Sequence, residues 1–209
     1  MAKDSKKSSI FETHYHDYIN RLAGIDMEPR LPILDIQMKG NTCVVPFFGE
    51  EYRVSPEGIT DASGTLPSYE VCVMLCRYLL NCPRQLPVQD DWVSFRDFKD
   101  AGPLTVFYRN SVEGLIVRSF AGNIPALKTA AAALGGHPPL LELNYDVVLR
   151  FVALPRTPLL LLFNDAEDDF PPQCSLLFER RTEKFLDAES IAIVGSILAN
   201  RLSKSTGDK

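Results

Sequence analysis

The segment between Pro67 and Pro83 constrains the fold most, because the helix it predicts is apolar on nearly every side. Within this segment only Glu70 and Arg77 carry a charge. One stripe recurs at helical spacing and comprises Tyr69, Val73, Cys76 and Leu80. A helix that is apolar on most faces is normally buried. We therefore expect residues 67–82 to lie at the centre of a folded domain.

Strand-like patterns lie on both sides of this helix. Short β-rich runs separated by glycine-containing turns predict a small antiparallel meander, and they cover residues 33–38, 43–48 and 52–54. From Leu143 to Val152 apolar residues alternate with other side chains, which predicts a long strand with one buried face. The continuous apolar run at residues 158–163 predicts a central strand of the same sheet.

Two further helical regions are predicted in the second half of the chain. Residues 111–134 indicate two helices, the first capped by Ser111, with a break at Gly122 and Asn123. Residues 187–203 indicate a last helix capped by Asp187. Its inner face would consist of Ile191, Val194, Leu198 and Leu202. The sequence thus predicts an α+β fold, a single domain in which a mixed or antiparallel sheet packs against helices.

The two ends of the chain differ from the middle. The first eight residues are polar, and the segment Ser9–Glu12 has the spacing of a capping box, where a helix would begin. We therefore predict a flexible polar tail over residues 1–8, a single globular domain over residues 9–203 and a flexible C-terminal tail over residues 204–209. The chain shows no internal repeat and no break in composition.

Charge and cysteine usage narrow the class of protein. The chain has 22 Lys and Arg against 27 Asp and Glu, a net charge of −5, which argues against nucleic acid as a partner. No apolar run is long enough to span a membrane, so we expect no membrane partner. The number of cysteines, five, is odd, and no signal peptide precedes them. Both observations predict a cytoplasmic protein with reduced thiols.

The cysteines and histidines do not have the spacing of a metal site. Cys72, Cys76 and Cys82 are separated by three and five residues, which matches no common ligand pattern. His14 and His16 point away from each other on a helix and cannot share an ion. We therefore predict no metal and no cofactor. The chain also has no phosphate-binding loop, dinucleotide fingerprint or nucleophile elbow, so no catalytic residue is predicted.

One short segment concentrates acidic residues, and we treat it as a candidate binding surface comprising Asp165, Glu167, Asp168 and Asp169. A calcium loop would need Gly at its sixth position and Glu at its twelfth, where this chain has Phe170 and Leu176. Two interpretations stay open: a solvated loop that protects a hairpin edge from pairing, and a contact surface that attracts a basic protein partner.

Several motifs together resemble a known family. They include Trp92–Phe98, Leu154–Pro158, Leu159–Phe163, Asp169–Pro172, Ser175–Phe178 and Phe185–Glu189. Over roughly residues 12–203 the chain is similar to the bacterial domain-of-unknown-function family 3786, found mainly in strict anaerobes. The resemblance implies no catalytic residues, because the family has no established activity. Some relatives carry an N-terminal four-cysteine iron–sulfur domain like that of corrinoid proteins in one-carbon metabolism; here a lysine- and serine-rich segment stands at that end.

Two hypotheses for the function follow. The first is a non-catalytic binding or accessory module of anaerobic metabolism that recognises a small ligand or a protein partner. The second is an enzyme or enzyme subunit acting with a corrinoid or iron–sulfur partner in one-carbon metabolism. Arg96 is a candidate binding residue in either case: it could pair with an acid and anchor a turn, or bind an anion. A pocket where Arg96, Tyr108 and Arg156 converge would favour the second hypothesis.

Overall fold

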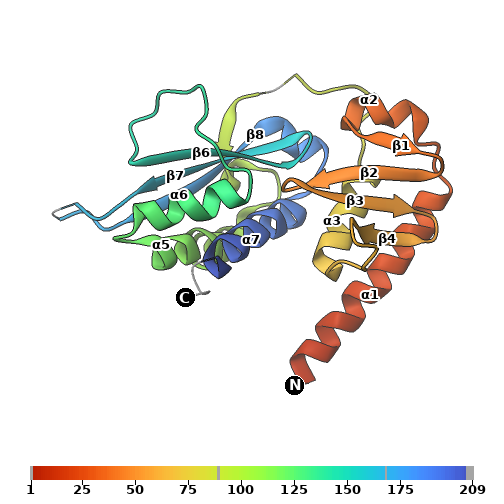
Figure 1. Ribbon diagram of the computed structural model, residues 1–209, viewed down its shortest axis with the longest axis horizontal. Coiled ribbons are helices and arrows are strands. Elements are labelled where there is room, and N and C mark those ends of the chain that lie inside the picture. Colours follow the sequence, from red (N-terminus) through yellow and green to blue (C-terminus); the bar gives the residue numbers. More distant parts are fainter. Residues whose placement is uncertain (1, 89, 168, 206–209) are drawn as a thin grey trace.

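The chain folds into two four-stranded antiparallel sheets that lie side by side and share helices (Figure 1). The structure is a computed structural model that describes residues 2–88, 90–167 and 169–205, without the side chains of residues 2–11. The α+β class predicted from the sequence is confirmed. The predicted meander forms a four-stranded sheet of its own beside the sheet that contains residues 147–164.

The N-terminal sheet is a meander in which each strand pairs with the next along the chain. Its order is β1 (Gln37–Lys39), β2 (Thr42–Phe47), β3 (Glu50–Ser55) and β4 (Gly58–Asp61). Helix α1 (Ala2–Ala23) packs along α3 (Tyr69–Leu80) beside this sheet. The hydroxyl of Tyr15 on α1 accepts the backbone N–H of Ile59 on β4 at 3.1 Å, so the helix is fixed to the sheet edge.

The C-terminal sheet combines strands that are distant in the sequence. Its order is β5 (Trp92–Ser94), β8 (Gln173–Glu179), β7 (Thr157–Asn164) and β6 (Val147–Leu154). In Figure 1 the helices on one face of this sheet are α5 (Gly114–Phe120), α6 (Ile124–Ala133) and α7 (Ala188–Lys204). Asp187 caps α7 as predicted, because its carboxylate accepts the N–H of Ser190 at 2.9 Å.

Short helical segments connect these elements. They are the 3₁₀ turn η1 (Glu28–Arg30), α2 (Leu31–Leu34), η2 (Phe95–Asp97), η3 (Gly102–Leu104), α4 (Thr105–Phe107), a π-helix (Tyr108–Glu113) and η5 (Arg180–Lys184). The π-helix lies between α4 and α5 and continues directly into α5. Ser111 lies inside it, so the predicted cap at Ser111 is wrong, whereas the predicted break before Asn123 is confirmed by the Asn123 cap of α6.

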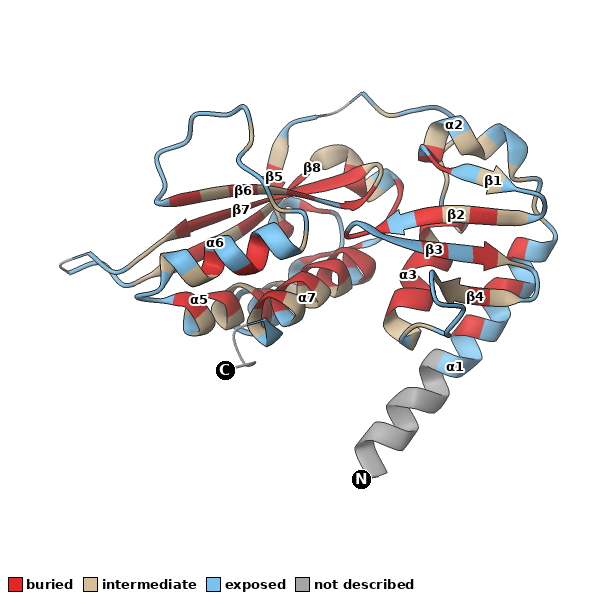
Figure 2. Cartoon of the chain, in the orientation of Figure 1, coloured by how far each residue is buried: buried red, intermediate tan, exposed pale blue. Residues whose placement is uncertain are grey.

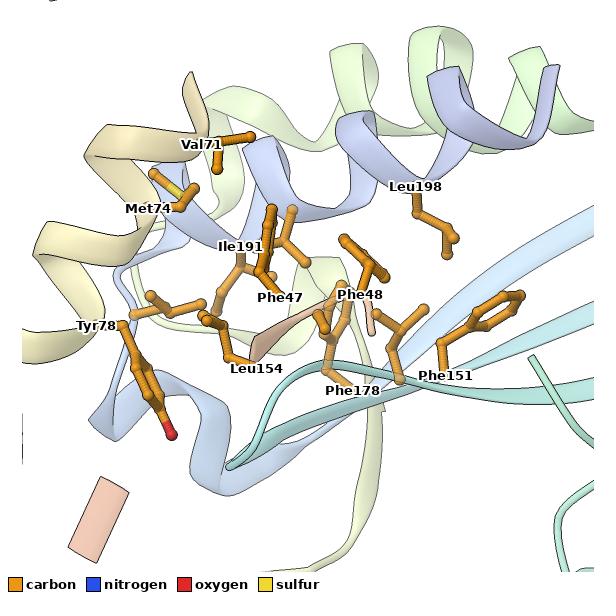
Figure 3. Packing of buried hydrophobic residues seen from close by; sticks show 14 of the residues in the cluster. Phe47, Phe48, Val71, Met74, Tyr78, Phe151, Leu154, Phe178, Ile191 and Leu198 are labelled. Atoms are coloured by element: carbon orange, nitrogen blue, oxygen red, sulfur yellow. The ribbon is translucent and has the colours of Figure 1, made fainter. Parts of the chain in front are cut away.

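One hydrophobic core joins the two sheets. In Figure 3, Phe47, which ends β2, and Phe48, in the turn that follows it, lie in one cluster with Ile191 of α7 and with Leu154 and Phe178 of the C-terminal sheet. The backbone N–H of Phe48 also donates to the carbonyl of Ala153 at 2.8 Å. Figure 2 shows buried residues on the strands and on the faces of α3 and α7 that meet them. The prediction that residues 67–82 contain a buried helix is confirmed, since eight of the twelve residues of α3 are buried.

Three element boundaries differ from the predictions. Helix α2 takes residues 31–34, where a strand was expected, and β1 begins at Gln37. Strand β6 begins at Val147 rather than at Leu143, and Leu143 itself is exposed. Helix α1 begins at Ala2, before the predicted capping box at Ser9. Residues 206–209 of the predicted C-terminal tail lie outside the described residues.

A search of the helices in the described residues found none that is both long and apolar enough to cross a membrane.

Candidate functional site

A cavity of about 820 Å³ opens between three segments of the chain beside the C-terminal sheet. Turn η2 follows β5, the π-helix precedes α5, and the first residues of β8 form the third wall. The side chains important for its chemistry are Arg96, Tyr108, Arg109, Glu113, Arg118 and Cys174. The cavity therefore collects three arginines in a chain whose net charge is −5.

Arg96 lies on a turn that the local sequence fixes. The carboxylate of Asp97 accepts both the backbone N–H of Ser94 at 3.0 Å and its hydroxyl at 2.5 Å, which closes the turn. The guanidinium Nε of Arg96 lies 3.8 Å from a carboxylate oxygen of Asp97, and the Arg96 side chain is 68% exposed. This contact is too long for a hydrogen bond, so Arg96 can reorient toward a ligand.

The π-helix arranges the second wall. Widening the helix by one residue turns Tyr108 inward, where its ring stacks on Phe95 with centroids 4.2 Å apart and planes within 10°. Arg109 and Glu113 line the cavity from the same segment. In a regular α-helix these two residues would be i,i+4 neighbours able to pair, but no ion pair within 4.0 Å forms between them. π-Helical turns inside α-helices often mark functional sites.

Glu113 is the half-buried acid of the cavity. Its Oε1 accepts the backbone N–H of Leu176 on β8 at 3.0 Å, which links the π-helix to the sheet. Burial raises the pKa of Glu113, although the Leu176 N–H and the charges of Arg109 and Arg96 act in the opposite direction.

Tyr108 borders the cavity with its ring, but its hydroxyl reaches the core. That hydroxyl is buried and has no hydrogen-bond partner among the described residues. A side-chain carbon added at Gly195 of α7 would lie 2.8 Å from Cε2 and 2.9 Å from Cζ of the ring, so the tyrosine packs directly on the helix backbone. Burial also raises the pKa of Tyr108 well above its usual value, so this phenol is held neutral.

Removing the Tyr108 hydroxyl should not destabilise the protein. A buried hydroxyl without a partner costs free energy, and phenylalanine keeps the stack on Phe95. We expect Tyr108→Phe to leave the free energy of unfolding unchanged or to raise it by about 1 kcal/mol. Urea denaturation measures this. A loss of stability would mean that the hydroxyl has a bonded partner.

Cys174 is the only thiol among the residues lining this cavity. Its side chain is buried, and this burial, with the Glu113 charge as a second cause, raises the pKa of the thiol well above its usual value. A thiol held in its protonated form is a poor nucleophile. Cys174 therefore contributes packing rather than reactivity.

The acidic segment divides into two parts. Asp165 is structural, because its carboxylate accepts the N–H of Gly122 at 2.9 and 3.0 Å and so fastens the loop to the break between α5 and α6. Glu167 pairs with Phe170 through two backbone hydrogen bonds near the tip of the β7–β8 hairpin, which projects from the fold in Figure 1. Asp169 lies in this tip, and Asp168 lies outside the described residues. Partner binding by this segment stays a prediction.

The structure does not bring all the predicted residues together. Pro172 and Gln173, just after the acidic segment, line the same cavity as Arg96, but Asp165, Glu167 and Asp169 do not. Arg156 lies elsewhere, where its guanidinium donates to the carbonyls of Ile33 and Pro32, both at 3.0 Å. The convergence of Arg96, Tyr108 and Arg156 that would favour an enzyme is therefore not present.

Arg109, Glu113 and Arg118 line the cavity but were not predicted from the sequence. The available signal was a local excess of arginine, since these two arginines lie within ten residues of each other in an acidic chain. In the part of the chain that the structure describes, no three His, Cys, Asp or Glu residues gather in a way that could hold a metal ion. Metal and cofactor content stays a prediction.

Comparisons with known proteins give one match. A family model described as a domain of unknown function, DUF3786, matches residues 26–201, in agreement with the resemblance seen in the sequence. A search of curated proteins and a search of solved structures found no match.

Proposed function

The chain belongs to the DUF3786 family, a family of unknown function, and we propose from its own geometry that it is a binding module whose cavity takes a small ligand with a carboxylate or phosphate group. The observation that carries this proposal is the set of three arginines, Arg96, Arg109 and Arg118, around one cavity.

The arginines of the cavity are incompletely neutralised. Arg96 has only the 3.8 Å contact with its neighbour Asp97. Arg118 donates to a backbone carbonyl, that of Asn110, at 3.2 Å. The guanidinium of Arg109 makes no hydrogen bond or ion pair with the described residues. Guanidinium groups bind carboxylates and phosphates through paired hydrogen bonds, so an anionic ligand would complete the site.

The size of the cavity and the state of its other groups support binding rather than catalysis. Small-molecule sites usually have volumes of about 300–1,000 Å³, and the cavity of about 820 Å³ falls in this range. The Cys174 thiol is protonated and the Tyr108 hydroxyl points into the core, so neither is placed to attack a ligand. Action with a corrinoid or iron–sulfur partner stays an alternative that no contact in the structure favours.

The proposed setting follows from the thiols and the resemblance. All five cysteines are free, which supports a reducing compartment such as the cytoplasm. A role in anaerobic metabolism is proposed on the resemblance alone. Within that setting the module would hold a metabolite or present it to a partner.

Arg109→Gln tests the proposed function. We expect inorganic phosphate and succinate to bind the wild-type protein and to raise its Tm. The substitution should weaken both affinities by about 10- to 100-fold, since hydrogen bonds to charged groups contribute about 1.5–3 kcal/mol. Isothermal titration calorimetry measures the two affinities.

Arg84→Gln is the matched control, because Arg84 is exposed and does not line the cavity. This variant should bind both anions as the wild type does. If neither anion binds the wild-type protein at about 10 mM, or if the two variants lose equal affinity, the cavity is not an anion site.

A further inference from the structure

Glu113 places a carboxylate among the arginines of the cavity, and this combination restricts the ligand further. Its Oε1 is occupied by the Leu176 N–H at 3.0 Å. Its Oε2 accepts no hydrogen bond from the described residues, and the Glu113 side chain lines the cavity. The cavity therefore offers one acceptor oxygen beside its guanidinium donors.

The titratable groups facing Glu113 come from three elements. Arg109 lies on the same π-helix, Arg96 lies on η2, and β8 contributes the neutral Cys174 thiol. No arginine nitrogen lies within 4.0 Å of the carboxylate in the described structure. The acid and the arginines thus line the same cavity without forming a close ion pair, so each can still contact a ligand.

A ligand with negative charge alone would gain from the arginines and be repelled by Glu113. A ligand with a negative group and a neighbouring positive group would gain from both, because each group would meet a charge of opposite sign at short range.

We propose that the cavity binds a zwitterionic ligand of the α-amino acid class, with its anionic group on Arg109 and Arg96 and its ammonium group donating to Oε2 of Glu113. This assignment rests on the proposed anion-binding function and specifies its ligand. The geometry that carries it is a carboxylate oxygen without a hydrogen-bond partner and incompletely neutralised guanidinium groups that line the same cavity.

A purely structural role for Glu113 makes a different prediction. If the side chain served only to hold β8, glutamine would replace it fully, because an amide oxygen can accept the Leu176 N–H equally well. Glu113→Gln therefore keeps the shape and this hydrogen bond, and it removes only the negative charge. We expect the variant to fold with a Tm close to that of the wild type.

Aspartate and succinate are the probes, because they share a carbon skeleton and differ in the ammonium group. We expect the wild-type protein to bind aspartate at least about tenfold more tightly than succinate, the value of one charge-assisted hydrogen bond. An arginine-only site would show the opposite order, since succinate carries the larger negative charge. In Glu113→Gln the preference should disappear or reverse.

A second measurement needs no variant. N-Acetylaspartate has an uncharged amide in place of the ammonium group, and it should bind the wild-type protein no better than succinate. A wild-type protein that prefers succinate, or a Glu113→Gln variant that keeps the wild-type ratio, overturns the zwitterion assignment and leaves the anion site standing. If aspartate, succinate and phosphate all fail to bind the wild-type protein, the proposed function itself is overturned.

Discussion

Replacing Leu79 with alanine is expected to lower the free energy of unfolding by roughly 2–5 kcal/mol, the range for a fully buried leucine. Leu79 is 1% exposed on α3, the helix that packs against α1 and α7. Truncation removes apolar contacts and leaves a void that the surrounding core cannot fill completely. Chemical denaturation followed by circular dichroism measures the change.

Leu66→Ala is the control for this experiment. Leu66 is 49% exposed and lies just before α3, so its truncation removes little buried surface. We expect its effect to stay within about 0.5 kcal/mol. Equal midpoints for Leu79→Ala and the wild type would place α3 at the periphery and contradict the packing described above.

Gly195→Ala is the second substitution with a large expected effect, and its sign is informative. At an exposed helix position alanine is more favourable than glycine by roughly 1 kcal/mol. At Gly195 the added carbon would lie within 3.0 Å of the Tyr108 ring, which is itself enclosed by the core. We therefore expect a loss of about 1–3 kcal/mol, the range for overpacking, measured as a fall in Tm.

Two comparisons make this prediction specific. Gly102→Ala should have little effect, because nothing lies within 4 Å of a side-chain carbon there. In a Tyr108→Leu background, which removes the ring atoms that clash, Gly195→Ala should cost less than it does in the wild type. Additive effects of the two substitutions would show that Gly195 and Tyr108 are not coupled.

The sequence predicted those elements whose signal is local. The stripe on α7 formed by Ile191, Val194, Leu198 and Leu202 is fully buried, and the cap at Asp187 starts the helix where expected. Such features depend on neighbours in the chain, and pattern analysis can detect them.

Predictions failed where distant residues decide the outcome. Leu143 and Tyr145 continue the alternation of β6, but they are exposed, since the ladder with β7 begins only at Val147 opposite Phe163. A strand needs a partner as well as a pattern. The predicted meander does form, but its strand pattern alone could not specify that it stays separate from the other sheet.

The candidate site was predicted only at Arg96. Glu113 gains its role from a π-helical turn and from the N–H of Leu176, which lies 63 positions further along the chain. Neither the widened turn nor this contact leaves a spacing that the sequence analysis could identify. Tertiary contacts therefore set the positions of the site residues, whereas the core helices could be predicted from local sequence patterns.

The pairing of β5 with β8 has a consequence for biosynthesis. Trp92 lies opposite Glu179, so β5 leaves the ribosome long before its partner strand exists. The N-terminal meander pairs neighbouring strands and can form early, whereas the C-terminal sheet must wait for long-range pairing. Until Gln173–Glu179 has been synthesised, the hydrogen-bonding edge of β7 and the side of α5 that contacts β8 lack their partner strand. Unpaired strand edges and exposed apolar surface of this kind make a nascent chain prone to aggregation.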